Sequence, residues 1–245
     1  MEIRQIRQIG GGNQGYIISK VQELFNTALG EQSKVKASQG GICYMLSMEW
    51  LRRVILEGIS DEVVHFNEQQ QVDDNLYYYK QIANNYYNYV QNLLAQNDME
   101  ADVNQILEEA AAGLLVSRNE IDKLYAELSS WGEMEAVVTY IVSSDQELVN
   151  VFEEKKPQYF LLGAGWKVQS PGSDEVRTIG HRMAGMVNSN GQIILYDPNE
   201  GVLEINSVDK MLEWICDRYK KFGTPYSFNL CVVRDARPHT SGESE

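Results

Sequence analysis

The feature that most constrains the fold is a change of hydrophobic period at Pro157. From about residue 61 to 156, apolar residues recur at spacings of three and four, so this stretch predicts helices almost throughout. After Pro157, short apolar segments bounded by turn residues predict strands instead. Helices followed by strands in one chain predict the α+β class, with an antiparallel sheet in the second half.

The chain shows no internal repeat and no clear domain break. Its 245 residues suffice for one domain with a sizeable core, and we expect that domain to span residues 16–235. Residues 16–156 are its helical part and residues 157–235 its sheet-rich part. Residues 1–15, which contain GGGNQG, predict a flexible lead-in, and residues 236–245 predict a disordered tail.

Individual elements follow from apolar stripes and end signals. Helices are predicted over residues 16–30, 43–58 and 208–219. Two capping boxes, at Ser117 and Ser144, predict further helix starts. Four segments predict strands: QYFLLGAGWKV, HRMAGMV, QIILYD and SFNLCVV.

The formal net charge of −14 limits the partners. A surface this acidic repels nucleic acid and anionic lipid and attracts basic protein segments, although solubility alone also explains the charge. No apolar run approaches the roughly 18 residues of a membrane-spanning helix, and MEIRQIRQIG lacks the apolar block of a signal peptide. We therefore expect no nucleic-acid partner, no membrane span and no conventional secretory export.

The three cysteines, Cys43, Cys216 and Cys231, are too few and too irregularly spaced for a disulfide scaffold. No Cys-x-x-Cys motif is present, so we expect neither a zinc site nor another metal or cofactor. Cys216, in a predicted helix, and Cys231, in a predicted strand, are interpreted as buried apolar thiols.

The segment QGGICYMLSMEWL places Cys43 in the first turn of a predicted helix. A cysteine is a nucleophile as its thiolate, and a helix N-terminus lowers the pKa of a thiol. Gly40 and Gly41 leave room for a substrate backbone, and the Cys43 N–H is placed to stabilise an oxyanion. Gln39 is either a second oxyanion donor or an exposed loop residue. Cys43 itself is either a nucleophile or a small packed side chain.

A base for this thiol must come from one of three histidines. His239 lies in the tail and His65 in a polar helical stretch, whereas His181 begins a predicted strand. A lone histidine is more often structural than catalytic, so the position of His181 relative to other polar residues decides its interpretation.

Turn chemistry sets the register of the hairpin HRMAGMVNSNGQIILYDPNEG that follows His181. Its SNG loop has three residues with glycine in the left-handed position, so Asn188 pairs with Gln192. Asp197 then lies diagonal to His181 on the same face, with about 7 Å between Cβ atoms. A helix-start cysteine, a strand histidine and a same-face aspartate predict a nucleophile, a base and an orienting group.

These segments resemble the motifs of a known family. GGICYMLSMEW resembles the cysteine motif of the YopT-type family of papain-fold proteases, and HRMA followed by YDPNEG resembles its histidine and aspartate motifs. The resemblance implies a papain-like fold, with a helical subdomain that carries the nucleophile packed on a C-terminal antiparallel sheet. It also implies that Cys43 is the nucleophile, His181 the general base and acid, and Asp197 the orienting carboxylate.

Members of that family are mostly bacterial virulence effectors delivered into host cells by type III secretion, or domains of larger toxins. They cut eukaryotic host proteins, including small GTPases near their basic C-termini and plant kinases. The resemblance therefore implies a thiol protease that acts on a host protein in the host cytosol, or otherwise in the cytoplasm. Two alternatives stay open: a transglutaminase or deamidase with the same triad, and a non-catalytic host-protein-binding module.

Overall fold

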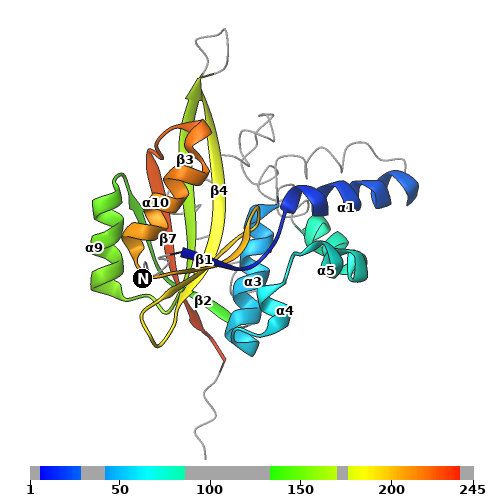
Figure 1. Ribbon diagram of the computed structural model, residues 1–245, viewed down its shortest axis with the longest axis horizontal. Coiled ribbons are helices and arrows are strands. Elements are labelled where there is room, and N and C mark those ends of the chain that lie inside the picture. The colour runs from blue at the N-terminus through cyan, green and yellow to red at the C-terminus, as the bar shows by residue number, and fades with distance from the viewer. Residues whose placement is uncertain (1–5, 29–41, 86–132, 170–175, 238–245) are drawn as a thin grey trace, which may run out of the picture.

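The computed structural model of the protein describes residues 6–28, 42–85, 133–169 and 176–237 (Figure 1). The described strands form one seven-stranded antiparallel sheet in the order β1-β6-β5-β4-β3-β7-β2. Their bounds are β1 Ile6–Gly10, β2 Met134–Val142, β3 Tyr159–Gln169, β4 Val176–Val187, β5 Ile193–Asp197, β6 Gly201–Ile205 and β7 Ser227–Asp235.

Helices flank this sheet, so the predicted α+β class is confirmed. Their bounds are α1 Gln14–Ala28, α3 Cys43–Glu57, α4 Asp61–Val64, α5 Gln69–Asp74, α9 Asp145–Lys155 and α10 Val208–Arg218, followed by the short 3-10 helix η1 Lys220–Phe222. Residues 76–85 are also helical. None of the described helices is long and apolar enough to cross a membrane.

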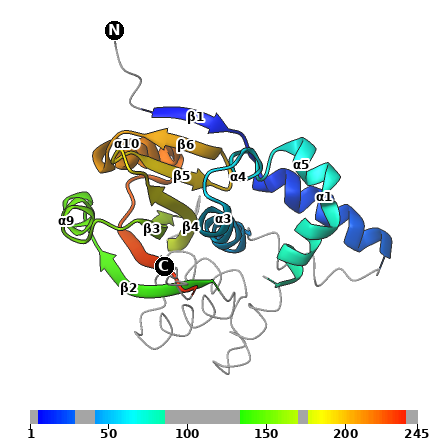
Figure 2. The same cartoon turned by 90° about the horizontal axis from the view of Figure 1, so that it is seen from below.

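Each face of the sheet has its own apolar core, because successive side chains of a strand point to opposite faces. Leu161 and Ala184 pack with helix α3 on one face. Phe160 and Met183, one position away on the same two strands, pack with α9 and α10 on the other. Figures 1 and 2 show α9 and α3 on opposite sides of β3 and β4. The sheet thus separates the helix that begins with Cys43 from the C-terminal helix α10.

Helix α3 is fixed against the sheet by specific contacts as well as by apolar burial. The Trp50 ring stacks on Tyr196 of β5, with centroids 5.3 Å apart, and its Nε1–H donates to the Val63 carbonyl at 3.0 Å. One turn after the start of the helix, the Ser47 hydroxyl donates to the carbonyl of Arg182 on β4 at 3.0 Å. These contacts hold the first turns of α3 next to the middle of β4.

The prediction of a flexible lead-in over residues 1–15 was wrong for residues 6–15, the part that the structure describes. Residues 6–10 form edge strand β1 on β6, and α1 begins at Gln14. The glycines allow close approach: a Cβ on Gly10 would lie 1.9 Å from the Val64 carbonyl oxygen. Gly201, whose φ is +96°, approaches Gly10 closely, so a Cβ there would lie 2.3 Å from the Gly10 oxygen. The glycine run is therefore a packed segment.

The continuous helical pattern predicted from residue 61 to 156 was also wrong in part, because residues 134–142 form strand β2. This strand pairs with β7 at the far edge of the sheet and contains a bulge between Ala136 and Val138. Its burial does not alternate cleanly along the strand, which removes the period that identifies strands. The sequence likewise gave no indication of β6.

Several local predictions are confirmed. Helix α3 ends at Gly58, whose φ is +73°, and the last predicted helix is α10. Ser144 caps α9 by accepting from the Glu147 N–H at 3.3 Å. The helix start predicted at Ser117 and most of the predicted tail lie outside the described residues.

Candidate active site

Cys43 is the first residue of helix α3, as predicted, and its side chain is 7% exposed. Ile42 occupies the cap position, and no side chain caps the helix there. The first N–H groups of a helix have no partner within the helix, so they form a positive end close to the thiol. Gln39, Gly40 and Gly41 lie outside the described residues.

The predicted hairpin register is confirmed. The Asn188 N–H donates to the Gln192 carbonyl at 2.9 Å, and Gly191 has φ +78°. Strand β5 ends at Asp197, and its pairing with β4 reaches back only to Ala184. Toward its N-terminal end, β4 extends past this pairing to Val176. His181 therefore lies past the end of β5, diagonal to Asp197.

His181 and Asp197 form a buried pair. The ring Nε2 of His181 lies 3.0 Å from Oδ1 of Asp197, and the two side chains are 6% and 0% exposed. The same ring lowers the pKa of the Cys43 thiol, through hydrogen bonding and through its positive charge. Because Nε2 is engaged by Asp197, Nδ1 is the ring nitrogen left to exchange a proton with the thiol. The structure thus brings together the three side chains singled out from the sequence.

The charges in this group support one another. Burial by itself would raise the pKa of the Cys43 thiol, but the hydrogen bond and the positive charge of His181 lower it below its ordinary value. Burial opposes the charged form of His181 as well, yet the Asp197 carboxylate raises the pKa of the imidazole. The pKa of Asp197 is lowered despite burial, chiefly by the charge of His181. These directions favour a thiolate, an imidazolium and a carboxylate in contact.

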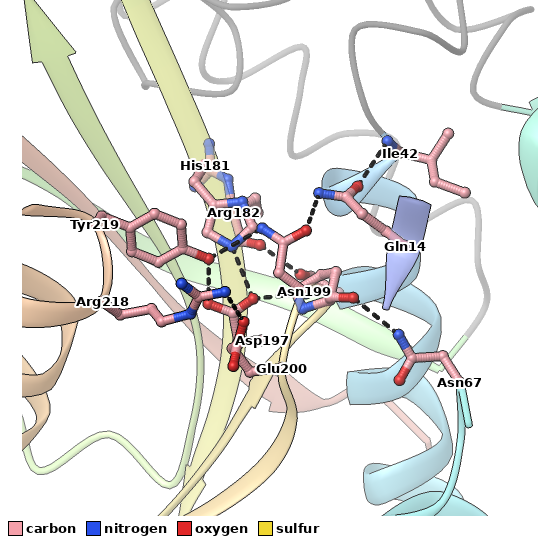
Figure 3. Close-up of polar contacts among 12 residues, drawn as sticks. Gln14, Ile42, Asn67, His181, Arg182, Asp197, Asn199, Glu200, Arg218 and Tyr219 are labelled. Carbon is pink, nitrogen blue, oxygen red and sulfur yellow. Dashed lines mark hydrogen bonds and ion pairs between the residues drawn. The ribbon is translucent and has the colours of Figure 1, made fainter. Parts of the chain in front are cut away.

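Two further residues hold Asp197, and the sequence did not identify them as part of the site. The Tyr219 hydroxyl, one residue past α10, donates to Oδ2 of Asp197 at 2.7 Å. The Asn199 backbone N–H donates to Oδ1 at 2.7 Å, and the Asn199 side-chain amide donates to the Tyr219 oxygen at 3.0 Å. Figure 3 shows His181 and Tyr219 converging on Asp197. Burial and the neighbouring carboxylate raise the pKa of Tyr219, so it stays a donor.

Gln14, at the start of α1, reaches the same group from the N-terminal segment. Its amide nitrogen donates to Oδ1 of Asn199 at 2.8 Å, and its amide oxygen accepts from the Ile42 N–H at 3.1 Å (Figure 3). The Gln14 backbone N–H also donates to the Pro198 carbonyl at 2.8 Å. A residue placed in the predicted lead-in therefore lies between the residue before Cys43 and the turn after Asp197.

The other described histidine and cysteines, His65, Cys216 and Cys231, do not join this group. His65 lies 2.8 Å from Glu68, which also accepts from the Gly11 N–H, and His239 lies outside the described residues. Cys231 is fully buried in β7, as predicted, whereas Cys216 on α10 is only partly buried, and burial raises the pKa of its thiol.

Chemically, the arrangement supplies an acidified thiol, a histidine that can give and take a proton, and a carboxylate that fixes the ring. Within the described ranges, no three histidine, cysteine or acidic side chains gather as metal ligands would. No protein-family model matches the chain, and no curated protein matches it either.

Proposed function

We propose that the protein is a cysteine endopeptidase of the papain-like type, with Cys43, His181 and Asp197 as its catalytic triad. The observation that carries this proposal is the buried His181 ring, which lies 3.0 Å from Asp197 and lowers the pKa of the thiol of a helix-start cysteine. A helix that carries the nucleophile, packed on an antiparallel sheet that carries the other two residues, supports the papain-like assignment.

In the first half of the reaction, the Cys43 thiolate attacks the carbonyl carbon of the scissile peptide bond. The Cys43 N–H, at the positive end of α3, stabilises the oxyanion that forms, and one such donor is typically worth about 2.7–4 kcal/mol. The imidazolium of His181 then gives its Nδ1 proton to the leaving amine as the C–N bond breaks, leaving a thioester on Cys43.

In the second half, His181 takes a proton from water as the water oxygen attacks the thioester carbonyl. The C–S bond breaks, the acid product leaves, and the thiolate and imidazolium are restored. Throughout, Asp197 holds the ring by its Nε2 and stabilises the positive charge.

The substrate class rests on the resemblance to YopT-type proteases. That resemblance favours a eukaryotic host protein as substrate, and a bacterial effector that is delivered into the host cytosol. The net charge of −14 suits a target with a basic segment, such as the tail of a small GTPase or part of a kinase.

The direct test is to incubate the protein with a eukaryotic cell lysate and to label new protein N-termini for mass spectrometry. Wild type is compared with Cys43→Ala, His181→Ala and the control Cys216→Ala, whose thiol lies outside the site. New N-termini that appear with wild type and with Cys216→Ala, but with neither triad variant, support the proposal.

The same samples test the alternatives. Glutamine residues that gain about one dalton, or glutamine–lysine crosslinks, would replace the protease with a deamidase or a transglutaminase that uses the same thiol. Substrate capture without any covalent change, equal in wild type and Cys43→Ala, would favour a binding module. Loss of folding in both triad variants would mean that these residues are core packing.

A further inference from the structure

The N-terminal segment, residues 6–14, fixes the direction of a run of hydrogen bonds that leads from Ile42 through Gln14, Asn199 and Tyr219 to Asp197. The starting point is the Ile42 backbone N–H, which can only donate. It donates to Oε1 of Gln14 at 3.1 Å, so the other end of that amide, Nε2, must face Asn199. The orientation of the Gln14 amide is therefore set by a group that cannot reverse.

The same logic continues through the next two residues. Because Gln14 presents a donor, Asn199 turns its oxygen toward it at 2.8 Å and its nitrogen toward the Tyr219 hydroxyl at 3.0 Å. The Tyr219 oxygen accepts there, so its single hydrogen is left for Asp197, at 2.7 Å. An amide flip at Gln14 or Asn199 would place two donors or two acceptors face to face.

We propose that Gln14 is a positioning residue that orients the hydrogen bonds running through Asn199 and Tyr219 to Asp197, a set that we call the relay. The N-terminal segment thereby determines how strongly Asp197 is held as a charged partner of His181. Gln14 touches neither the thiol nor the imidazole and acts through Asn199 and Tyr219. The proposal rests on the proposed function, since it assigns to the segment a role in preparing the Cys43–His181 pair for attack.

The segment itself is built to stay in place. Gly10 packs against the Val64 carbonyl, and the backbone N–H of Gln14 and the side chain of Asn67 both donate to the Pro198 oxygen, at 2.8 and 3.0 Å. Asn67 is 2% exposed. The turn that follows Asp197 is thus held from two sides.

The test compares three variants by the rate of Cys43 alkylation with iodoacetamide at pH 6, read by peptide mass spectrometry, and by the unfolding midpoint. Gln14→Glu keeps an acceptor for the Ile42 N–H but presents no donor to Asn199, and Gln14→Ala removes both contacts. Gln8→Ala is the matched control, because Gln8 donates from the same segment to the Glu200 carbonyl and touches no member of the relay.

We expect alkylation at pH 6 to fall severalfold in both Gln14 variants, and by no more than in Tyr219→Phe, because Gln14 acts only through Asn199 and Tyr219. Gln8→Ala should react as wild type does. In a Tyr219→Phe background, Gln14→Glu should have no further effect, because two residues of one relay are not additive.

Each other outcome overturns the inference. Gln14 variants that react like wild type, or that lose reactivity only in proportion to lost folding and to the same extent as Gln8→Ala, give Gln14 a purely structural role. Full additivity with Tyr219→Phe would place its effect outside the relay. These results leave the proposed function standing, whereas a wild-type Cys43 that is inert at pH 6 removes the proposed function itself.

Discussion

Among the described residues two carboxylates are buried, Glu49 in the middle of α3 and Asp197 at the end of β5, and they are neutralised in different ways. Glu49 accepts from Arg52 at 2.9 Å and from Arg53 at 3.0 Å, one turn further along its own helix. Arginine keeps its charge throughout the physiological pH range. The Glu49 pair is therefore a fixed charge arrangement that closes one side of α3.

Asp197 is paired instead with a group that titrates, and that group contacts a second one that titrates, the Cys43 thiol. Its other hydrogen-bond partners, Tyr219 and Asn199, contribute neutral donors. A proton can consequently move within the Asp197 group, whereas none can move around Glu49. Burial of a carboxylate is therefore not by itself a functional sign, because the nature of its partner decides whether a proton can move.

Removal of His181, the titrating partner of Asp197, should change the reactivity of Cys43 most. In His181→Ala, alkylation of Cys43 at pH 6 should fall by about a hundredfold or more, because the thiol returns toward its ordinary pKa. The measurement is the pH dependence of iodoacetamide modification at each cysteine. Unchanged reactivity at Cys43 would mean that the helix start alone acidifies the thiol.

Removing the charge of Glu49 should lower the stability of the fold and leave the reactivity of the Cys43 thiol unchanged. Glu49→Gln should lower the free energy of unfolding by about 2–3 kcal/mol near pH 7, because two arginines lose their buried partner. Arg52 and Arg53 hold the pKa of Glu49 below its ordinary 4.5 against the opposing effect of burial, so this stability is present above pH 4.5. It is lost as the pH falls through the pKa of the folded state.

Urea unfolding of wild type and Glu49→Gln at pH 7 and at pH 4 measures this difference. The gap between the two proteins should narrow at the lower pH, while Cys43 alkylation stays the same in both at pH 7. A Glu49→Gln variant with altered thiol reactivity would contradict the separation of the two groups.

Neutralising Asp197 should have an intermediate effect on the reactivity of Cys43. Asp197→Asn keeps the shape but removes the charge that raises the pKa of His181, so the imidazolium is lost at a lower pH. We expect alkylation at pH 6 to fall about tenfold, equivalent to one unit in the apparent pKa of the thiol. If the alkaline limb of the alkylation pH profile lies at the same pH in Asp197→Asn as in wild type, Asp197 only orients the ring.

The smallest expected effect concerns the donor behind Asp197. Tyr219→Phe removes one hydrogen bond to a buried carboxylate and should lower the free energy of unfolding by about 1–2 kcal/mol. Alkylation at pH 6 should fall only severalfold, since the His181 contact and the Asn199 N–H remain. Thermal unfolding and the alkylation rate, measured on the same sample, check both expectations. A loss as large as that of His181→Ala would make Tyr219 a full member of the catalytic group.

The sequence predicted the parts of the site that depend on local rules. Turn chemistry at Gly191 fixed the hairpin register, and with it the diagonal of His181 and Asp197. A glycine pair and a helix pattern located Cys43 at the start of α3. In each case the deciding residues are neighbours in the chain, so the rule that connects them operates within a few positions.

What the sequence could not predict depends on contacts between distant segments. Gln14 and Asn199 meet only because β1 and the residues after it pack beside the turn that follows β5. Glycines before Gln14 suggested flexibility, since a glycine that permits close packing and one that permits motion look alike in a single sequence. Strand β2 was missed because its bulge and its uneven burial hide the alternation.

The order of the strands has a consequence for biosynthesis. Cys43 lies in the first fifth of the chain, whereas His181, Asp197 and Tyr219 are all synthesised much later, and β1 must wait for β6 before it can join the sheet. A nascent chain that has exposed only α3 carries a thiol without its histidine, and that thiol keeps ordinary reactivity. The buried group of thiol, imidazole and carboxylate can therefore assemble only after the later strands have been synthesised.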